Sequence, residues 1–247
     1  MDTPRGRPLA LALALSVLLT AAGPAPAAAQ EAPPPDSLRV YLLTFGPGAA
    51  VWERFGHNAL WIHDPGAGTD MAYHYGLFDM SESGFLTRFL QGRMAYSMGS
   101  ADAMRLMEAY RRAGREATVQ ALNLTQPRIR ELRAFLQWNL RPENRVYRYD
   151  YFRDNCSTRV RDALDDALGG ALRRALTARP TAITYRSEAV SLTAEDELLS
   201  TGMDLGLGPL ADQPLTRWEL SFIPMRLRDD VRRMTVEVDG RTAPLVL

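Results

Sequence analysis

Residues 149–169 read YDYFRDNCSTRVRDALDDALG and contain Cys156, the only cysteine of the chain. Asp154 or Asn155 is a suitable helix N-cap, and two glycines end the pattern at 169 and 170. The apolar residues between these limits recur at helical spacing: Val160, Ala163, Leu164, Ala167 and Leu168. Cys156 lies one turn before the first of them, so its thiol is expected in the first turn of a helix, directed inward. Free N–H groups and the helix dipole there favour an anion, which predicts a lowered thiol pKa and a position suited to a nucleophile.

The three histidines of the chain, His57, His63 and His74, fall in one predicted β-hairpin. Residues 57–63 and 71–75 alternate as strands on either side of the turn DPGAGTD. A nucleophilic cysteine needs a base to take its proton, and that base needs a partner to fix its ring. His57, at the start of its strand, is the predicted base, and His74, on the adjacent strand, is its predicted partner. His63 is expected at a solvated strand end beside the turn.

Five other residues are candidates for supporting roles near the thiol and the histidines. Asn58 and Asp79 are alternative groups for orienting the ring of the base. The remaining three flank the main candidates in sequence: Asn155, Tyr75 and Arg159. No cofactor is implied, and a metal site is disfavoured because the histidines and the cysteine lack the close spacing of metal ligands.

The other elements complete an α+β fold in which a small, mainly antiparallel sheet carries the two histidines and packs against the helix of the cysteine. Strands are expected over 38–46, 93–99, 115–124 and 145–152. Helices are expected over 83–92, 100–114 with Ser100 as N-cap, and 125–142 with Thr125 as N-cap. Residues 38–170 then form the catalytic core. Residues 171–247 belong to the same domain, as a helical cover up to residue 233 and a final hairpin turning at 239–240.

The N-terminus predicts export. Residues 1–30 combine two arginines, an apolar run and a cleavage site of small residues, as in a secretory signal peptide. Residues 31–37 form a proline-rich tether. The mature protein is therefore expected in the periplasm. The 247 residues carry 29 basic and 29 acidic side chains, which gives no indication of a nucleic-acid partner.

Cys156 has a simpler alternative role. Most free cysteines are small buried hydrophobes without chemistry. In an oxidising compartment, however, an unpaired thiol is a liability that Ala or Val would avoid. The histidines that could serve it strengthen the catalytic interpretation.

The segments FGHNALWI, YHYGLFDM, FLQGRMAYSM and YDYFRDNCSTRVRD, in that order, resemble the Lnb N-terminal periplasmic domain family, and GPLADQPLTRWELSFIPMRL resembles its C-terminal part. That family is similar to the circularly permuted papain-like enzymes, which include relatives of lecithin:retinol acyltransferase. The resemblance implies a permuted papain-like core in which histidine precedes cysteine. It also implies that Cys156 is the nucleophile, His57 the general base and acid, and His74 the orienting residue.

The resemblance further implies a thiol acyltransferase that works through a thioester. Named family members move a fatty acyl chain from phospholipid to the N-terminal amine of a lipoprotein, so phospholipid and lipoprotein are the expected substrates. The same residues would serve a lipid hydrolase or a cell-wall amidase or peptidase. A non-enzymatic binding domain is the third alternative.

Residues 217–228, RWELSFIPMRLR, offer a candidate contact with the inner membrane. Their aromatic and aliphatic side chains lie among three arginines, a composition suited to a phospholipid interface. The alternative is an amphipathic helix, broken at Pro224, that packs on the core.

Overall fold

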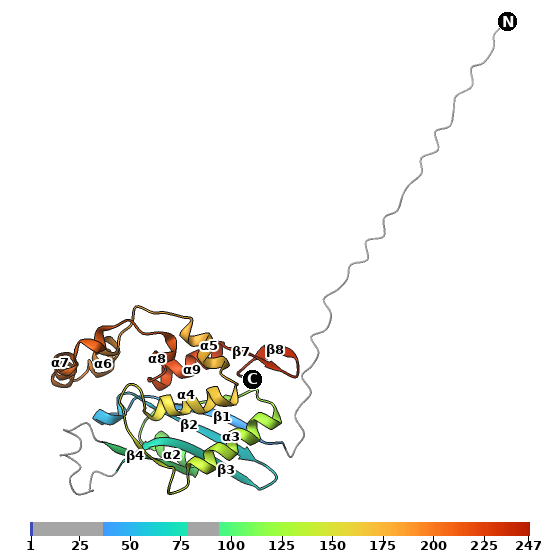
Figure 1. The fold of residues 1–247 in the computed structure, drawn as a ribbon, viewed down its shortest axis with the longest axis horizontal. Coiled ribbons are helices and arrows are strands. Elements are labelled where there is room, and N and C mark those ends of the chain that lie inside the picture. Colours follow the sequence, from blue (N-terminus) through green and yellow to red (C-terminus); the bar gives the residue numbers. More distant parts are fainter. Residues whose placement is uncertain (2–36, 79–93) are drawn as a thin grey trace. The chain divides into compact units, whose positions relative to one another are not determined.

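A six-stranded antiparallel sheet lies at the centre of the fold, seen here in a computed structural model that describes residue 1, residues 37–78 and residues 94–247 (Figure 1). The strand order is β5-β1-β2-β3-β4-β6. In chain order the strands are β1 Arg39–Phe45, β2 His57–Asp64, β3 Thr69–Leu77, β4 Ala95–Asp102, β5 Ala117–Ala121 and β6 Val146–Arg148. The predicted α+β class and the mainly antiparallel sheet are confirmed.

Helices cover both faces of this sheet. On one face, α2 (Ala103–Arg112) packs its Leu106 and Tyr110 against a cluster that contains Ala59. On the other face, α3 (Gln126–Asn139) and α4 (Cys156–Ala167) pack against a larger cluster that contains Leu60 and Ile62. The alternation predicted for 57–63 is therefore confirmed, since neighbouring residues of β2 belong to different clusters.

The C-terminal helices lie beyond α4. They are α5 Ala171–Thr177, α6 Tyr185–Thr193, α7 Glu197–Gly206, α8 Arg217–Leu220 and α9 Pro224–Arg233. Short 3₁₀ helices lie at Val51–Glu53 and Pro209–Asp212. Figure 1 shows α4 between the sheet on one side and α5, α8 and α9 on the other. The cysteine helix is thus packed between the sheet and the C-terminal helices.

The final hairpin is confirmed. Strands β7 (Thr235–Val238) and β8 (Arg241–Pro244) pair antiparallel around Asp239 and Gly240. Both turn residues have positive φ, 51° and 72°, as a two-residue turn between right-twisted strands requires.

Two predicted boundaries are wrong. The N-cap of α2 is Asp102, which accepts the N–H of Arg105 at 2.9 Å, because β4 continues through Ser100 and pairs it with Tyr73. Strand β6 ends at residue 148, short of the predicted 152, because Asp150 accepts backbone N–H groups and turns the chain. The helix predicted over 83–92 lies outside the described residues.

The apolar side chains of 217–228 do not form a free surface. Trp218, Phe222 and Leu227 are all buried in the core clusters. Arg217 and Arg226, which were candidates for phospholipid head groups, are ion-paired with Asp230 and Glu188. The amphipathic pattern of 217–228 therefore serves core packing in this structure, and a contact of this segment with the inner membrane stays a prediction.

Candidate functional site

Cys156 is the first residue of α4, at the N-terminus predicted for it. Of the two predicted caps, Asp154 and Asn155, the helix uses Asn155, whose side chain accepts the N–H of Ser157 at 2.9 Å. The Asn155 amide also donates to the carbonyl oxygen of Phe222, 2.9 Å away in the C-terminal segment. Asn155 therefore fixes the start of the cysteine helix and ties it to the rest of the core.

A glycine lets this helix terminus approach the sheet. A Cβ built on Gly76 would lie 3.3 Å from the Cβ of Cys156, and Gly76 has a φ of +92° that side chains rarely adopt. The strand is irregular here, since the β3–β4 register shifts between His74 and Leu77, and the β2–β3 pairing ends at Ala59–His74. The irregular end of β3 thus makes room for the thiol-bearing residue.

His57 and His74 lie beside each other on the adjacent strands β2 and β3. His57 Nε2 is 3.1 Å from His74 Nδ1, a hydrogen bond that confirms the predicted contact between the rings. The His57 ring is also parallel to the rings of Phe45 and Tyr110, whose centroids lie 6.3 and 6.0 Å away. One side of the imidazole is thereby held by His74 and another by aromatic packing.

Both imidazoles are uncharged at neutral pH. Burial lowers the pKa of His57 well below 6.5, and repulsion from the Arg115 guanidinium and from the protonated form of His74 lowers it further. Burial also lowers the pKa of His74. In the tautomer in which His57 Nε2–H donates to His74, the His57 Nδ1 carries a free lone pair and is available as a base.

The thiol is also uncharged, contrary to the prediction of a lowered pKa. Burial raises the pKa of Cys156 to about 11, and this effect exceeds the opposing effect of the backbone N–H groups of Asn58, Ser157 and Cys156 itself. Among the described residues, no hydrogen bond joins the sulfur to His57 or His74. The resting site is therefore a neutral thiol near a neutral histidine pair, and an ion pair is not preformed.

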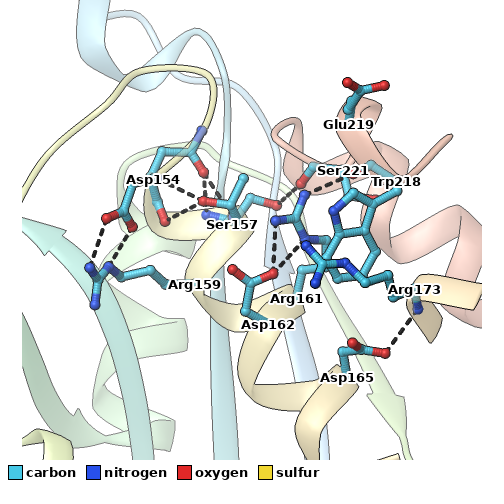
Figure 2. Close-up of polar contacts among 12 residues, drawn as sticks. Asp154, Ser157, Arg159, Arg161, Asp162, Asp165, Arg173, Trp218, Glu219 and Ser221 are labelled. Carbon is cyan, nitrogen blue, oxygen red and sulfur yellow. Dashed lines mark hydrogen bonds and ion pairs between the residues drawn. The ribbon is translucent and has the colours of Figure 1, made fainter. Parts of the chain in front are cut away.

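Asn58 does not orient the base. Its amide donates to Thr44 Oγ1 at 2.8 Å, on the α4 side of the sheet. The Ser157 hydroxyl lies 2.9 Å from Asn58 Oδ1 and 2.6 Å from the Ser221 carbonyl oxygen, and Figure 2 shows the contact between the two serines. The side chain of Asn58 thus joins β2 to the cysteine helix, while the ring of His57 lies on the opposite face.

Tyr75 and Arg159 also have structural contacts. The Tyr75 hydroxyl donates to Asn139 Oδ1 at 2.7 Å. Arg159 makes a bidentate pair with Asp154, at 2.6 and 2.8 Å (Figure 2), and its guanidinium covers the ring of Tyr147 at 3.7 Å. These contacts stabilise the loop and helix around the thiol, so neither residue is brought to the histidine pair.

The remaining candidates lie elsewhere. His63 is at the far end of β2, 30% exposed, with Nδ1 2.7 Å from Asp70. It is thus a strand-end residue, as predicted. Asp79 lies outside the described residues. Within 37–78 and 94–247, no group of three histidine, cysteine, aspartate or glutamate side chains is arranged to hold a metal ion.

Arg115 and Tyr110 belong to this region and were missed from the sequence. The Arg115 guanidinium lies 4.5 Å from the Tyr110 ring centroid, on the α2 side of the sheet. They come from the end of α2 and the residues after it, and nothing in that local sequence marks them as neighbours of His57. Only the packing of α2 on the sheet brings them there.

Fold and site together define an α+β domain that presents a single cysteine, at a helix N-terminus, to the end of an antiparallel sheet carrying two hydrogen-bonded histidines. The chain belongs to the Lnb N-terminal periplasmic domain family, whose model matches residues 25–188. The match is shorter than expected, since residues 208–227, predicted as the C-terminal part of the family pattern, lie outside it. No curated protein and no solved structure matches the chain.

The family name places this domain in the periplasm, in agreement with the predicted localisation. None of the helices in the described parts of the chain has the length and apolar character needed to cross a membrane.

Proposed function

We propose that this protein is a periplasmic thiol acyltransferase that takes a fatty acyl group from phospholipid onto Cys156 and passes it to an amine, as in lipoprotein N-acylation. The observation that carries the proposal is the packing of Cys156 on Gly76, at the strand ends where His57 and His74 are joined at 3.1 Å. A nucleophile, a base and a residue that orients the base are the parts that acyl transfer through a thioester requires.

The proton movements follow from the neutral resting state. As the sulfur attacks the ester carbonyl, the thiol proton passes to Nδ1 of His57, and His74 stabilises the imidazolium through its hydrogen bond. The backbone N–H groups of Asn58 and Cys156 are available to the oxyanion. His57 then returns the proton to the leaving alcohol, and a thioester remains. An amine, a hydroxyl or water attacks the thioester in the second half-reaction, and the thiol is regenerated.

Exposed apolar side chains near the site support a fatty acyl group as the transferred unit. Val51 and Trp52 lie in the short 3₁₀ helix that precedes His57, and Leu77 follows Gly76; all three are exposed. Exposed apolar residues around a nucleophile favour contact with an aliphatic chain over contact with a sugar or a charged peptide.

The experiment measures acyl transfer from vesicles of phosphatidylethanolamine and phosphatidylglycerol to a diacylated lipopeptide, with free fatty acid as the product of hydrolysis. Cys156→Ala should abolish both products, and His57→Gln should lower their rate by about 10²- to 10⁴-fold. His63→Gln is the matched control and should retain the wild-type rate. Equal rates in His57→Gln and His63→Gln would exclude His57 as the base.

Two alternatives make different predictions. An amidase or peptidase with the same residues would release fragments from purified peptidoglycan and leave the vesicles unchanged. A non-enzymatic binding domain is favoured by one observation, the thiol pKa of about 11, and it would leave both substrates unchanged.

A further inference from the structure

Arg115 carries a buried guanidinium nitrogen with no partner. Its side chain is only 5% exposed. Nε donates to the carbonyl oxygen of Gly46 at 2.9 Å, and Nη1 donates to Glu53 at 3.2 Å. Nη2 is buried, and among the described residues nothing accepts its hydrogen bonds. A buried donor without an acceptor is unfavourable, and more so for a charged group, so an unfilled position of this kind calls for a ligand.

The unpartnered nitrogen belongs to the group of side chains around the histidine pair. The Arg115 guanidinium carbon lies 4.5 Å from the centroid of the Tyr110 ring. The Tyr110 ring in turn stacks on Phe45 at 3.8 Å and is parallel to His57 at 6.0 Å. The positive charge of Arg115 lowers the pKa of both His57 and Cys156, which places it within electrostatic range of the proposed base and the proposed nucleophile.

Two of the three nitrogens are fixed by the protein, so the third is held in a set direction. Such preorganisation suits recognition of an anionic oxygen, because little side-chain entropy is lost when the ligand binds. Glu53 already offsets part of the charge through Nη1, and its side chain is itself partly exposed. The arginine therefore retains hydrogen-bonding capacity for one further anionic group.

We propose that Arg115 is a substrate-binding residue whose Nη2 hydrogen-bonds an anionic phosphate oxygen of the acyl donor beside Cys156. This inference rests on the proposed function and assigns the residue that recognises the phosphate of its phospholipid donor. The site should prefer acyl donors that carry a phosphodiester over neutral acylglycerols.

The test compares alkylation of Cys156 by two reagents of similar size, anionic iodoacetate and neutral iodoacetamide, in the intact protein. If Arg115 receives anions, the ratio of the iodoacetate rate to the iodoacetamide rate should fall by about tenfold in Arg115→Gln, as expected for loss of one charge-assisted hydrogen bond. Arg115→Lys keeps the charge and should retain much of the ratio. Arg133→Gln removes one positive charge from the pair with Asp64, at the other end of β2, and should leave the ratio unchanged.

A measurement on the wild-type protein covers the case in which Arg115→Gln does not fold. Inorganic phosphate should slow the reaction of Cys156 with iodoacetamide in a saturable manner, and choline chloride at equal ionic strength should not. Cys156 could react while phosphate gives no protection and the ratio of iodoacetate to iodoacetamide rates is the same in the wild type and in every variant that folds. That result would overturn the role of Arg115 and leave the proposed nucleophile intact. A thiol that reacts with neither reagent until the protein unfolds would instead overturn the proposed function, and the role of Arg115 with it.

Discussion

Replacing Gly76 by alanine tests the packing that brings Cys156 to the sheet. Gly76 has a φ of +92°, and an added Cβ would meet the Cβ of Cys156 at 3.3 Å. An L-residue in such a conformation costs about 1–3 kcal/mol, and the close contact also forces the first turn of α4 to move by a few tenths of an ångström. Gly68→Ala is the matched control, because Gly68 has a φ of +63° and nothing within 4 Å of its added Cβ.

The expected free energy of unfolding is lower by about 2–3 kcal/mol in Gly76→Ala and by about 1 kcal/mol in Gly68→Ala. For a domain of this size, each 1 kcal/mol shifts the melting temperature by about 2–4 °C. Thermal melts should therefore separate the two variants by several degrees.

The acyl-transfer activities of the two folded variants should differ more clearly than their melting temperatures. A displacement of a few tenths of an ångström at the nucleophile should lower acyl transfer from vesicles by about 3- to 10-fold in Gly76→Ala, since reactions of this kind are sensitive to the alignment of the reacting atoms. Gly68→Ala should match the wild type. Equal stability and equal activity of the two variants would refute the inference that Cys156 is positioned by close contact with Gly76.

Three further predictions concern the polar groups around the thiol. Because burial lowers the pKa of His57 and His74 below 6.5, the unfolded chain binds protons that the folded chain does not as the pH falls below that value. The free energy of unfolding measured in urea titrations should thus decline as the pH falls below 6.5, and less steeply in the double variant His57→Gln/His74→Gln. The same pH dependence in the wild type and the double variant would contradict this. Ser157→Ala leaves Asn58 Oδ1 without its hydroxyl partner and should lower the free energy of unfolding by about 1–3 kcal/mol, whereas a change near zero would mean that water replaces the hydroxyl. Asn155→Ala removes the N-cap and should cost about 0.5–2 kcal/mol in the same titration; an unchanged midpoint would argue against the cap.

Local features of the site could be predicted from sequence. The cap at Asn155 and the glycines after Leu168 fix the limits of the cysteine helix, and both signals lie within one stretch of chain. The contact between His57 and His74 follows from strand alternation and a short turn. In each case the residues that decide the structure are near one another in sequence.

Features that depend on tertiary packing could not be predicted. The thiol pKa rises because the assembled core removes water from Cys156, and a helix terminus considered alone gives the opposite sign. Gly76 is important only because the first residue of α4 packs against it. Arg115 lies close to the histidine pair only because α2 packs on the sheet. The composition of 217–228 suits both a membrane surface and a protein core, and only the packed structure shows that Trp218, Phe222 and Leu227 are buried in the core.

Acylation of Cys156 with His57 as the base can be followed by intact-protein mass spectrometry after brief incubation with phosphatidylethanolamine–phosphatidylglycerol vesicles, without an amine acceptor. We expect a mass increase of one fatty acyl group that hydroxylamine removes and that maps to Cys156. This adduct should accumulate far more slowly in His57→Gln than in His63→Gln. A folded protein whose thiol still reacts with iodoacetamide but gains no acyl group from the vesicles would show that Cys156 is not an acyl acceptor.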